Sequence, residues 1–262
     1  MFITLPSGPT LFVHERHGDH PTLVFLHYYG GSSRTWAPII EALPRDMGVI
    51  APDLRGWGRS ERSTEGHTLA GYADDVEAVL ANTQVGEYVL VGHSMGGKIA
   101  QLIASRRPAG LRGVVLVAPA PPTALALPLE VRAGMVAAYD TRESIEGALE
   151  HVLTGRPLTP QQREQVIEDS MSGTPEARLA WPMEISQTDI TDAVRRIEVP
   201  VLVLSGDTDK VDTTDTLEAE LMPRLAHAEL RVLPGVGHLV PLEAPEEAAR
   251  SIAAFVERLR AG

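Results

Sequence analysis

The sequence predicts an α/β fold, a doubly wound and mostly parallel sheet covered by helices on both faces. Three observations lead to this prediction. Short apolar segments without polar alternation recur along the 262-residue chain, as is typical of parallel strands buried on both faces. Segments with helical periodicity separate them. The residues suited to catalysis all follow apolar segments, at the strand ends where such sheets place their sites.

The expected elements can be placed in order along the chain. A hairpin lies at the edge of the sheet, its strands at residues 2–5 and 10–16 flanking the turn Ser7-Gly8-Pro9. Further buried strands are expected at residues 23–27, 49–51, 88–91, 114–117, 201–204 and 230–233. Clear helical patterns lie at residues 69–81, 97–105 and 245–259.

The most informative segment is residues 88–100, where an apolar strand is followed by a sharp turn and a helix. The spacing Gly-x-Ser-x-Gly, with Ser94 at its centre, predicts a strained serine at the apex of the turn. Side chains at Gly92 or Gly96 would collide with the neighbouring strand or helix. The turn exposes the serine hydroxyl and aims the first amides of the helix at whatever it attacks. This context indicates a nucleophile.

A catalytic serine needs a base, and the base needs a carboxylate that orients it. His238 lies in a Gly/Pro-rich loop after an apolar strand. An acidic loop after an earlier strand carries Asp207 and Asp209, with Asp212 close behind. The chain order Ser, Asp, His is the one associated with this serine turn. The pattern leaves the choice among the three aspartates open.

These motifs resemble those of the α/β-hydrolase family, in its subgroup of compact, capped, cofactor-free enzymes. The resemblance covers nearly all of the chain and rests on the segments 26–32, 53–60, 88–100, 205–209 and 237–238. It implies that Ser94 is the nucleophile and His238 the base. The family pattern Gly-x-x-Asp implies that Asp209 is the acid. It also implies that neither a cofactor nor a metal is required.

Two backbone donors must face the oxygen that becomes negative during acyl transfer. One is expected to be the amide of Met95, directly after the nucleophile. The resemblance implies that the other comes from the loop after the third strand, where Tyr29 takes the donor position. The chain departs from the family at Tyr28, where glycine is usual. Two readings stay open: both tyrosines pack the pocket floor, or a tyrosine hydroxyl joins the oxyanion hole or gates the pocket.

The alternation of strands and helices stops at residues 120–189, a segment of helical character. The resemblance implies a small helical cap inserted there, after the sixth strand, with residues 1–119 and 190–262 forming the hydrolase core. An apolar roof over the site favours substrates with apolar parts. The candidate pocket residues are His27, Tyr28, Met135, Tyr139 and Trp181.

Several other polar residues have structural explanations. His93 is expected to be a packing residue that faces away from the nucleophile, and His27 to brace loops near the site. The glycine-rich loop at residues 53–60 is architectural in the resembling family. The motif His14-x-x-His17-x-x-His20 lacks accompanying carboxylates at ligand spacing, so no metal site is expected there.

Composition narrows the class of protein. A net charge of −12 argues against nucleic-acid or anionic-membrane partners. The sequence contains no cysteine, so disulfides and thiol chemistry are excluded. The N-terminus lacks a signal-peptide pattern, and no apolar run reaches the length of about 20 residues that spans a bilayer. We therefore expect a cytoplasmic monomer or homodimer with a small-molecule substrate.

The motifs identify the candidate catalytic residues more closely than they identify the reaction. We expect a carboxylesterase-type enzyme that hydrolyses esters or lactones through an acyl-serine intermediate. The alternatives are carbon–carbon bond hydrolysis or perhydrolysis by the same triad, or a hydrolase-like receptor for a small molecule. A serine at the nucleophile position argues against epoxide and haloalkane hydrolysis, which need a carboxylate there.

Overall fold

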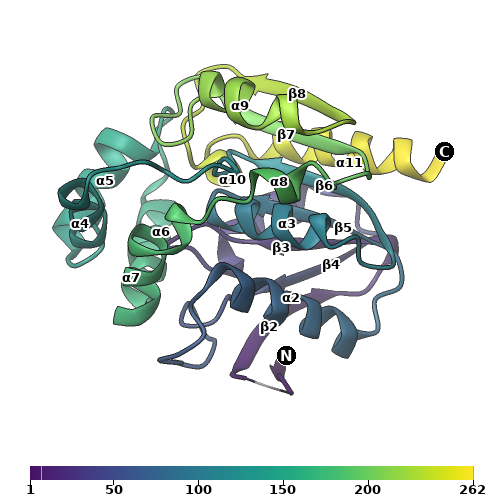
Figure 1. Ribbon diagram of the computed structural model, residues 1–262, viewed down its shortest axis with the longest axis horizontal. Helices are drawn as coiled ribbons and strands as arrows, with labels where there is room; N and C mark the ends of the chain where they lie inside the picture. Colours follow the sequence, from purple (N-terminus) through teal and green to yellow (C-terminus); the bar gives the residue numbers. More distant parts are fainter. Residues whose placement is uncertain (7, 262) are drawn as a thin grey trace.

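An eight-stranded sheet forms the centre of the molecule (Figure 1) in the computed structural model, which describes residues 1–6 and 8–261. The strand order is β1-β2-β4-β3-β5-β6-β7-β8. The strands are β1 (Phe2–Thr4), β2 (Thr10–Arg16), β3 (Asp19–Leu26), β4 (Met47–Pro52), β5 (Tyr88–His93), β6 (Leu111–Val117), β7 (Val201–Gly206) and β8 (Ala228–Leu233). Strand β2 runs antiparallel to β1 and β4, and the pairs from β4 to β8 are parallel. The doubly wound α/β prediction is confirmed, although Ser7 of the expected hairpin turn lies outside the described residues.

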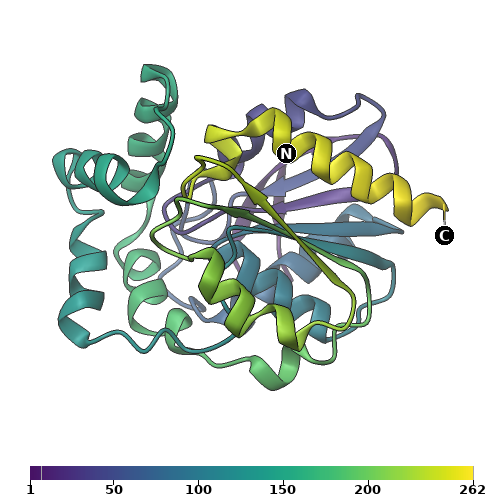
Figure 2. The ribbon, with the colours of Figure 1, turned by 90° about the horizontal axis from the view of Figure 1, so that it is seen from above.

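Helices cover both faces of the sheet, as the view from above shows (Figure 2). One face carries η1 (Ser33–Trp36), α1 (Ala37–Ala42), α10 (Val240–Glu243) and α11 (Pro245–Ala261). The other carries α2 (Leu69–Thr83), α3 (Met95–Ser105), α8 (Thr191–Val194), α9 (Thr214–Glu220) and η4 (Met222–Arg224). Every residue of β4, β5 and β7 is buried, because a parallel strand between two helical layers has no solvent-facing side.

A helical segment between β6 and β7 stands to one side of this core (Figures 1 and 2), and we call residues 120–189 the cap. Its helices are α4 (Leu129–Ala137), α5 (Arg142–Ala148), η2 (Leu149–Leu153), α6 (Pro160–Ser172), α7 (Pro175–Met183) and η3 (Ile185–Gln187). Thr159 and Thr174 cap the helices α6 and α7, each followed by proline at the first helical position, which is a strong start signal.

The two ends of the cap are joined at its base. The amide of Leu125 donates to Ser186 O at 2.8 Å, and the amide of Ile190 donates to Pro122 O at 2.9 Å. The chain therefore enters and leaves the cap side by side.

No helix in the described part of the chain has both the length and the apolar character needed to cross a bilayer. Within that part, no group of three or more acidic or histidine side chains is arranged to hold a metal ion. The side chain of His20, the last histidine of the motif near the N-terminus, lies outside the described residues.

Candidate active site

The turn between β5 and α3 holds Ser94 in a strained backbone conformation, with φ of 51° and ψ of −114°. Residues other than glycine rarely adopt a positive φ, and backbone strain of this kind concentrates at functional sites. A Cβ on Gly92 would lie 2.4 Å from Gly96 O, and a Cβ on Gly96 would lie 2.2 Å from Leu26 O. Since α3 begins at Met95, the amide of that residue has no acceptor within the helix. The turn thus places Ser94 beside the N–H of Met95. Only 4% of Ser94 is exposed, so the expectation that the turn exposes this residue to solvent is wrong.

The imidazole of His238 is hydrogen-bonded to Asp209, with 2.9 Å between Nδ1 and Oδ2, and both side chains are buried. The second carboxylate oxygen, Oδ1, accepts hydrogen bonds from the amides of Val211 at 2.8 Å and Asp212 at 3.2 Å. These amides fix the carboxylate. With Nδ1–H donating to Asp209, Nε2 carries the lone pair, which is the tautomer that a general base needs.

The other two aspartates of the acidic loop have different surroundings. Asp207 is exposed, and its Oδ1 accepts a hydrogen bond of 2.6 Å from the amide of Gly235. Asp212 is buried, and burial raises its pKa to about 7, helped by Asp209 and opposed by His238 and Lys98. Of the three aspartates that the sequence leaves open, Asp209 is the one bonded to the imidazole.

Burial alone would lower the pKa of His238, but Asp209, followed by Asp212 and Glu243, raises it above its usual range. Lys98 is buried on α3, where its Nζ donates to Thr123 O at 2.9 Å. Burial lowers the pKa of this lysine to about 8. A lysine on an otherwise apolar helix is the only sign of this buried charge in the sequence.

Two buried histidines brace the loops around the site. His93 Nε2 lies 2.8 Å from the carbonyl oxygen of His238, and the two rings pack with centroids 5.1 Å apart. His27 Nδ1 lies 2.8 Å from Tyr28 O, while its Nε2 accepts from the amide of Leu54 at 2.9 Å. Burial lowers the pKa of both histidines, so both are neutral and serve as hydrogen-bonding residues. The contact of His93 with the backbone of His238 goes beyond the packing role expected for it.

The hydroxyl of Tyr29 points to the cap. It donates to Arg178 O in α7 at 2.8 Å. Its ring packs edge-on against Trp57 and Tyr139, with centroids 5.4 and 4.5 Å away. Since this hydroxyl proton is already engaged by a carbonyl, the geometry favours the backbone amide of Tyr29 over its hydroxyl as a donor to an oxyanion.

The candidate pocket residues fall into two groups. Tyr139, Trp181 and Met135 pack into the same apolar cluster as Tyr29 and Met95, the two candidate amide donors. Tyr28 instead lies buried in the joint between cap and core, against the cap side chains Ile145, Leu149, Leu153, Val166 and Ile167. His27 is fully buried, and both of its ring nitrogens are engaged as described above. The structure therefore brings Tyr139 into contact with Tyr29. It places Trp181 and Met135 in the large apolar cluster on that face of the sheet, and it gives Tyr28 and His27 packing and bracing contacts.

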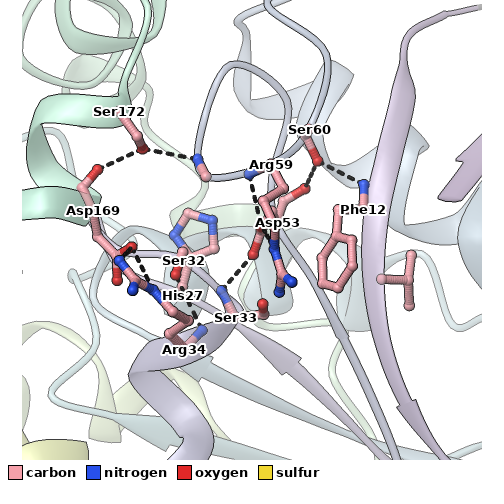
Figure 3. A network of polar contacts seen from close by, with 12 residues as sticks. Phe12, His27, Ser32, Ser33, Arg34, Asp53, Arg59, Ser60, Asp169 and Ser172 are labelled. Carbon is pink, nitrogen blue, oxygen red and sulfur yellow. Dashed lines mark hydrogen bonds and ion pairs between the residues drawn. The ribbon is translucent and has the colours of Figure 1, made fainter. Parts of the chain in front are cut away.

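The loop at residues 53–60 is held by a network of hydrogen bonds around Asp53 (Figure 3). Its carboxylate accepts from the amides of Ser33 at 2.6 Å and Arg59 at 2.8 Å. The hydroxyl of Ser60 donates to Asp53 O at 2.5 Å. These bonds shape the backbone, which is the architectural role expected of this loop.

The same network reaches the cap through an ion pair that the sequence did not predict. Arg34 Nη2, on η1, lies 2.6 Å from Asp169 Oδ1 on α6. Figure 3 shows the two side chains facing each other. Burial raises the pKa of Asp169 to about 6, against the opposite effect of Arg34. Residues 135 positions apart carry no local signal of their pairing, so only the tertiary structure brings them together.

Comparisons with known proteins agree with this fold. The chain is 30% identical to a non-heme haloperoxidase of Rhodococcus erythropolis over 256 residues, which cover 90% of this chain and 92% of that protein. It is 29% identical to a bifunctional esterase/perhydrolase of Acinetobacter calcoaceticus, over 97% of this chain and 99% of that one. A solved structure of an N-acyl homoserine lactone degrading enzyme matches with a TM-score of 0.83 and 27% identity, over 98% of this chain and 100% of that chain.

A family model described as "Alpha/beta hydrolase family" matches residues 23–251, which include the serine turn, the acidic loop and the His238 loop. The match takes in seven residues in every eight of the chain, and it extends from β3 into α11. The chain therefore belongs to the α/β-hydrolase family and is an enzyme of that type.

Proposed function

We propose that this enzyme hydrolyses carboxylic esters or lactones of small, largely apolar substrates through an acyl-Ser94 intermediate. The observation that carries the proposal is the buried hydrogen bond between Asp209 and His238. It fixes the imidazole tautomer that accepts a proton at Nε2, in a chain whose strained serine turn precedes both residues. The same arrangement needs no metal or cofactor to activate the nucleophile.

In this mechanism His238 Nε2 accepts the proton of Ser94 as Oγ attacks the carbonyl carbon. The resulting oxyanion accepts hydrogen bonds from the amides of Met95 and Tyr29. The imidazolium of His238 then returns its proton to the departing oxygen, and the carbon–oxygen bond breaks. Water then gives a proton to His238 as its oxygen attacks the acyl carbon. The bond from that carbon to Ser94 Oγ breaks, the imidazolium returns its proton to Oγ, and the carboxylic acid leaves.

The preference for apolar substrates is supported by the cap. The ring of Tyr139 packs against that of Tyr29, with centroids 4.5 Å apart, and Trp181 and Met135 belong to the same large apolar cluster. An apolar cap side chain therefore adjoins one of the proposed donor residues. Apolar walls with a few directed polar groups are typical of small-molecule sites. The lactone-degrading structural relative described above supports lactones as one substrate class.

A second candidate is perhydrolysis, favoured by the esterase/perhydrolase relative named above. Here hydrogen peroxide takes the place of water: its oxygen attacks the acyl carbon, a proton passes to His238, and a peroxy acid leaves as Ser94 regains its proton. The first half of the reaction is unchanged. Only the second nucleophile differs.

A panel of chromogenic esters of graded acyl length, extended with γ- and δ-lactones, tests the proposal. We expect hydrolysis of at least the short and medium acyl esters, and formation of peroxy acid when hydrogen peroxide is added would support the second candidate. A panel with no turnover by a protein that retains its thermal transition would overturn both. An Ser94→Ala variant distinguishes enzymatic turnover from background hydrolysis.

A further inference from the structure

Glu243, five residues after the candidate base, has an unusual set of partners. It lies on the short helix α10, and only 9% of its surface is exposed. Its Oε2 accepts hydrogen bonds from the amides of Gly155 at 2.8 Å, Arg156 at 2.7 Å and Gly237 at 2.9 Å. Its Oε1 accepts from the amide of Leu239 at 3.0 Å. One carboxylate thus binds four backbone donors.

These four donors come from two segments that are far apart in the sequence. Gly237 and Leu239 stand on either side of His238, so Glu243 holds the backbone of the base from both directions. Gly155 and Arg156 belong to the cap, just after η2. The carboxylate therefore joins the cap to the loop of the base.

The cap touches the base directly at the same place. The amides of His238 and Leu239 both donate to Leu153 O, at 3.0 and 3.2 Å. Gly155 and Gly237 lie back to back: a Cβ on Gly237 would come within 2.4 Å of Gly155 N. Such close backbone approach is possible only without side chains. Residues 237–239 carry the candidate base His238, and we call them the base loop. Hydrogen bonds join the base loop to cap residues 153–156, and Glu243 lies at the centre of this unit.

We propose that Glu243 is a positioning residue that sets the place of His238 by fastening its loop to the cap. The proposal rests on the role of His238 as the base in the proposed function. A carboxylate accepts at both oxygens, whereas an amide has one accepting oxygen and an NH2 group that opposes backbone donors. Only an ionised carboxylate of this length satisfies all four amides.

The test compares Glu243→Gln with Glu247→Gln. Glu247 is the matched control, because its Oε2 also lies beside Arg156, at 2.9 Å from Nη1. Its side chain is partly exposed, and within the described part of the chain it makes no bond to residues 237–239. In Glu243→Gln we expect kcat to fall by about 100-fold with little change in KM, since small misplacements of a catalytic group cost about that much. Exposed ion pairs contribute little to stability. The kcat of Glu247→Gln should therefore stay within about twofold of the wild-type value.

The dependence of kcat/KM on pH distinguishes a positioning role of Glu243 from a role in overall stability alone. The charged or titratable groups that face His238 are Asp209, Asp212, Glu243 and His93. Glu243→Gln removes one negative charge from this set, so the acid limb of kcat/KM should move to lower pH. Glu243→Asp keeps the charge but is one methylene shorter, so kcat should fall while the limb stays near its wild-type position.

Hydrogen exchange gives a readout that needs no substrate. In Glu243→Gln the amides of Gly155, Arg156 and Gly237 should exchange about tenfold faster or more, because each loses a bond to a charged acceptor. The amide of Leu239 keeps its bond to Leu153 O and should change less. Equal exchange in the two glutamine variants, or a folded Glu243→Gln enzyme with wild-type kcat, would overturn the proposal. If wild type turns over no ester, the proposed function fails, while the exchange data still decide whether Glu243 fastens the two segments. If Glu243→Gln does not fold, the same exchange measurement is made on Glu243→Asp. Exchange rates at these amides equal to those of wild type would then overturn the proposal.

Discussion

His93, the residue before the candidate nucleophile, is bonded through Nε2 to the carbonyl oxygen of His238 at 2.8 Å. These residues belong to β5 and to the loop after β8, which are separated in the sheet by β6 and β7. Since His93 and Ser94 are neighbours in the chain, the bond spans the sheet at its carboxyl edge. It ties the backbone of the proposed base to that of the proposed nucleophile.

Ser94→Ala should abolish ester turnover while leaving the fold intact, because in the proposed mechanism the Ser94 hydroxyl carries the acyl group. Loss of a triad member typically costs about 10⁴ to 10⁶ in rate. The measurement is the turnover rate together with labelling by an organophosphonate and peptide mapping. An adduct on any other serine would contradict the assignment.

Asp209→Asn should reduce kcat by about 10⁴, because an amide can present a donor to Nδ1 and favour the wrong tautomer of His238. Asp207→Asn should have little effect, since Asp207 accepts a bond from Gly235 on the protein surface. Steady-state kinetics of the two variants decide the matter. If Asp207→Asn is the more damaging change, the acid has been misassigned.

Activity should rise with pH through a pKa above about 6.5, because His238 must be neutral to accept the serine proton and its pKa is raised, mainly by Asp209 against the effect of burial. The profile of kcat/KM against pH reports this pKa in the free enzyme. Asp212 titrates at a pKa of about 7 in the same range. The acid limb should therefore survive in Asp212→Asn, displaced to lower pH, and its disappearance there would assign the limb to the aspartate.

Tyr29→Phe should leave kcat nearly unchanged, because the backbone amide survives the substitution. It should lower the free energy of unfolding by about 1 kcal/mol, since the bond from the hydroxyl to Arg178 O is lost. Chemical denaturation and ester kinetics measure the two effects. A loss of kcat of about 10² or more with unchanged stability and KM would instead indicate a hydroxyl in the oxyanion hole.

The sequence predicted those parts of the site that depend on local chain geometry. The strand, turn and helix around Ser94 are specified by adjacent residues, and so is the loop in which the Asp209 amide turns back to Gly206 O at 3.2 Å. The choice of Asp209 over Asp207 came from the family pattern. In the structure one carboxylate faces inward and the other faces solvent, a difference that spacing alone does not encode.

Contacts between distant segments could not be predicted. Arg34 and Asp169 meet across the joint between cap and core, and Glu243 meets Gly155 in the same way. A lone arginine or glutamate on a polar segment resembles any solvated charge until the fold supplies its partner. The cap helices were expected only as a helical segment, because their short amphipathic turns define boundaries weakly.

The paired backbone bonds at the base of the cap, from Leu125 to Ser186 and from Ile190 to Pro122, close the insertion at its root. An insertion whose ends already meet can change length at little entropic cost, since closure entropy grows only slowly with loop length. Evolution or an engineer can thus exchange the segment between these bonds without moving β6 or β7. A different cap inserted between these two bonds would bring new substrate contacts to the same sheet. It would have to supply its own two backbone donors for Glu243.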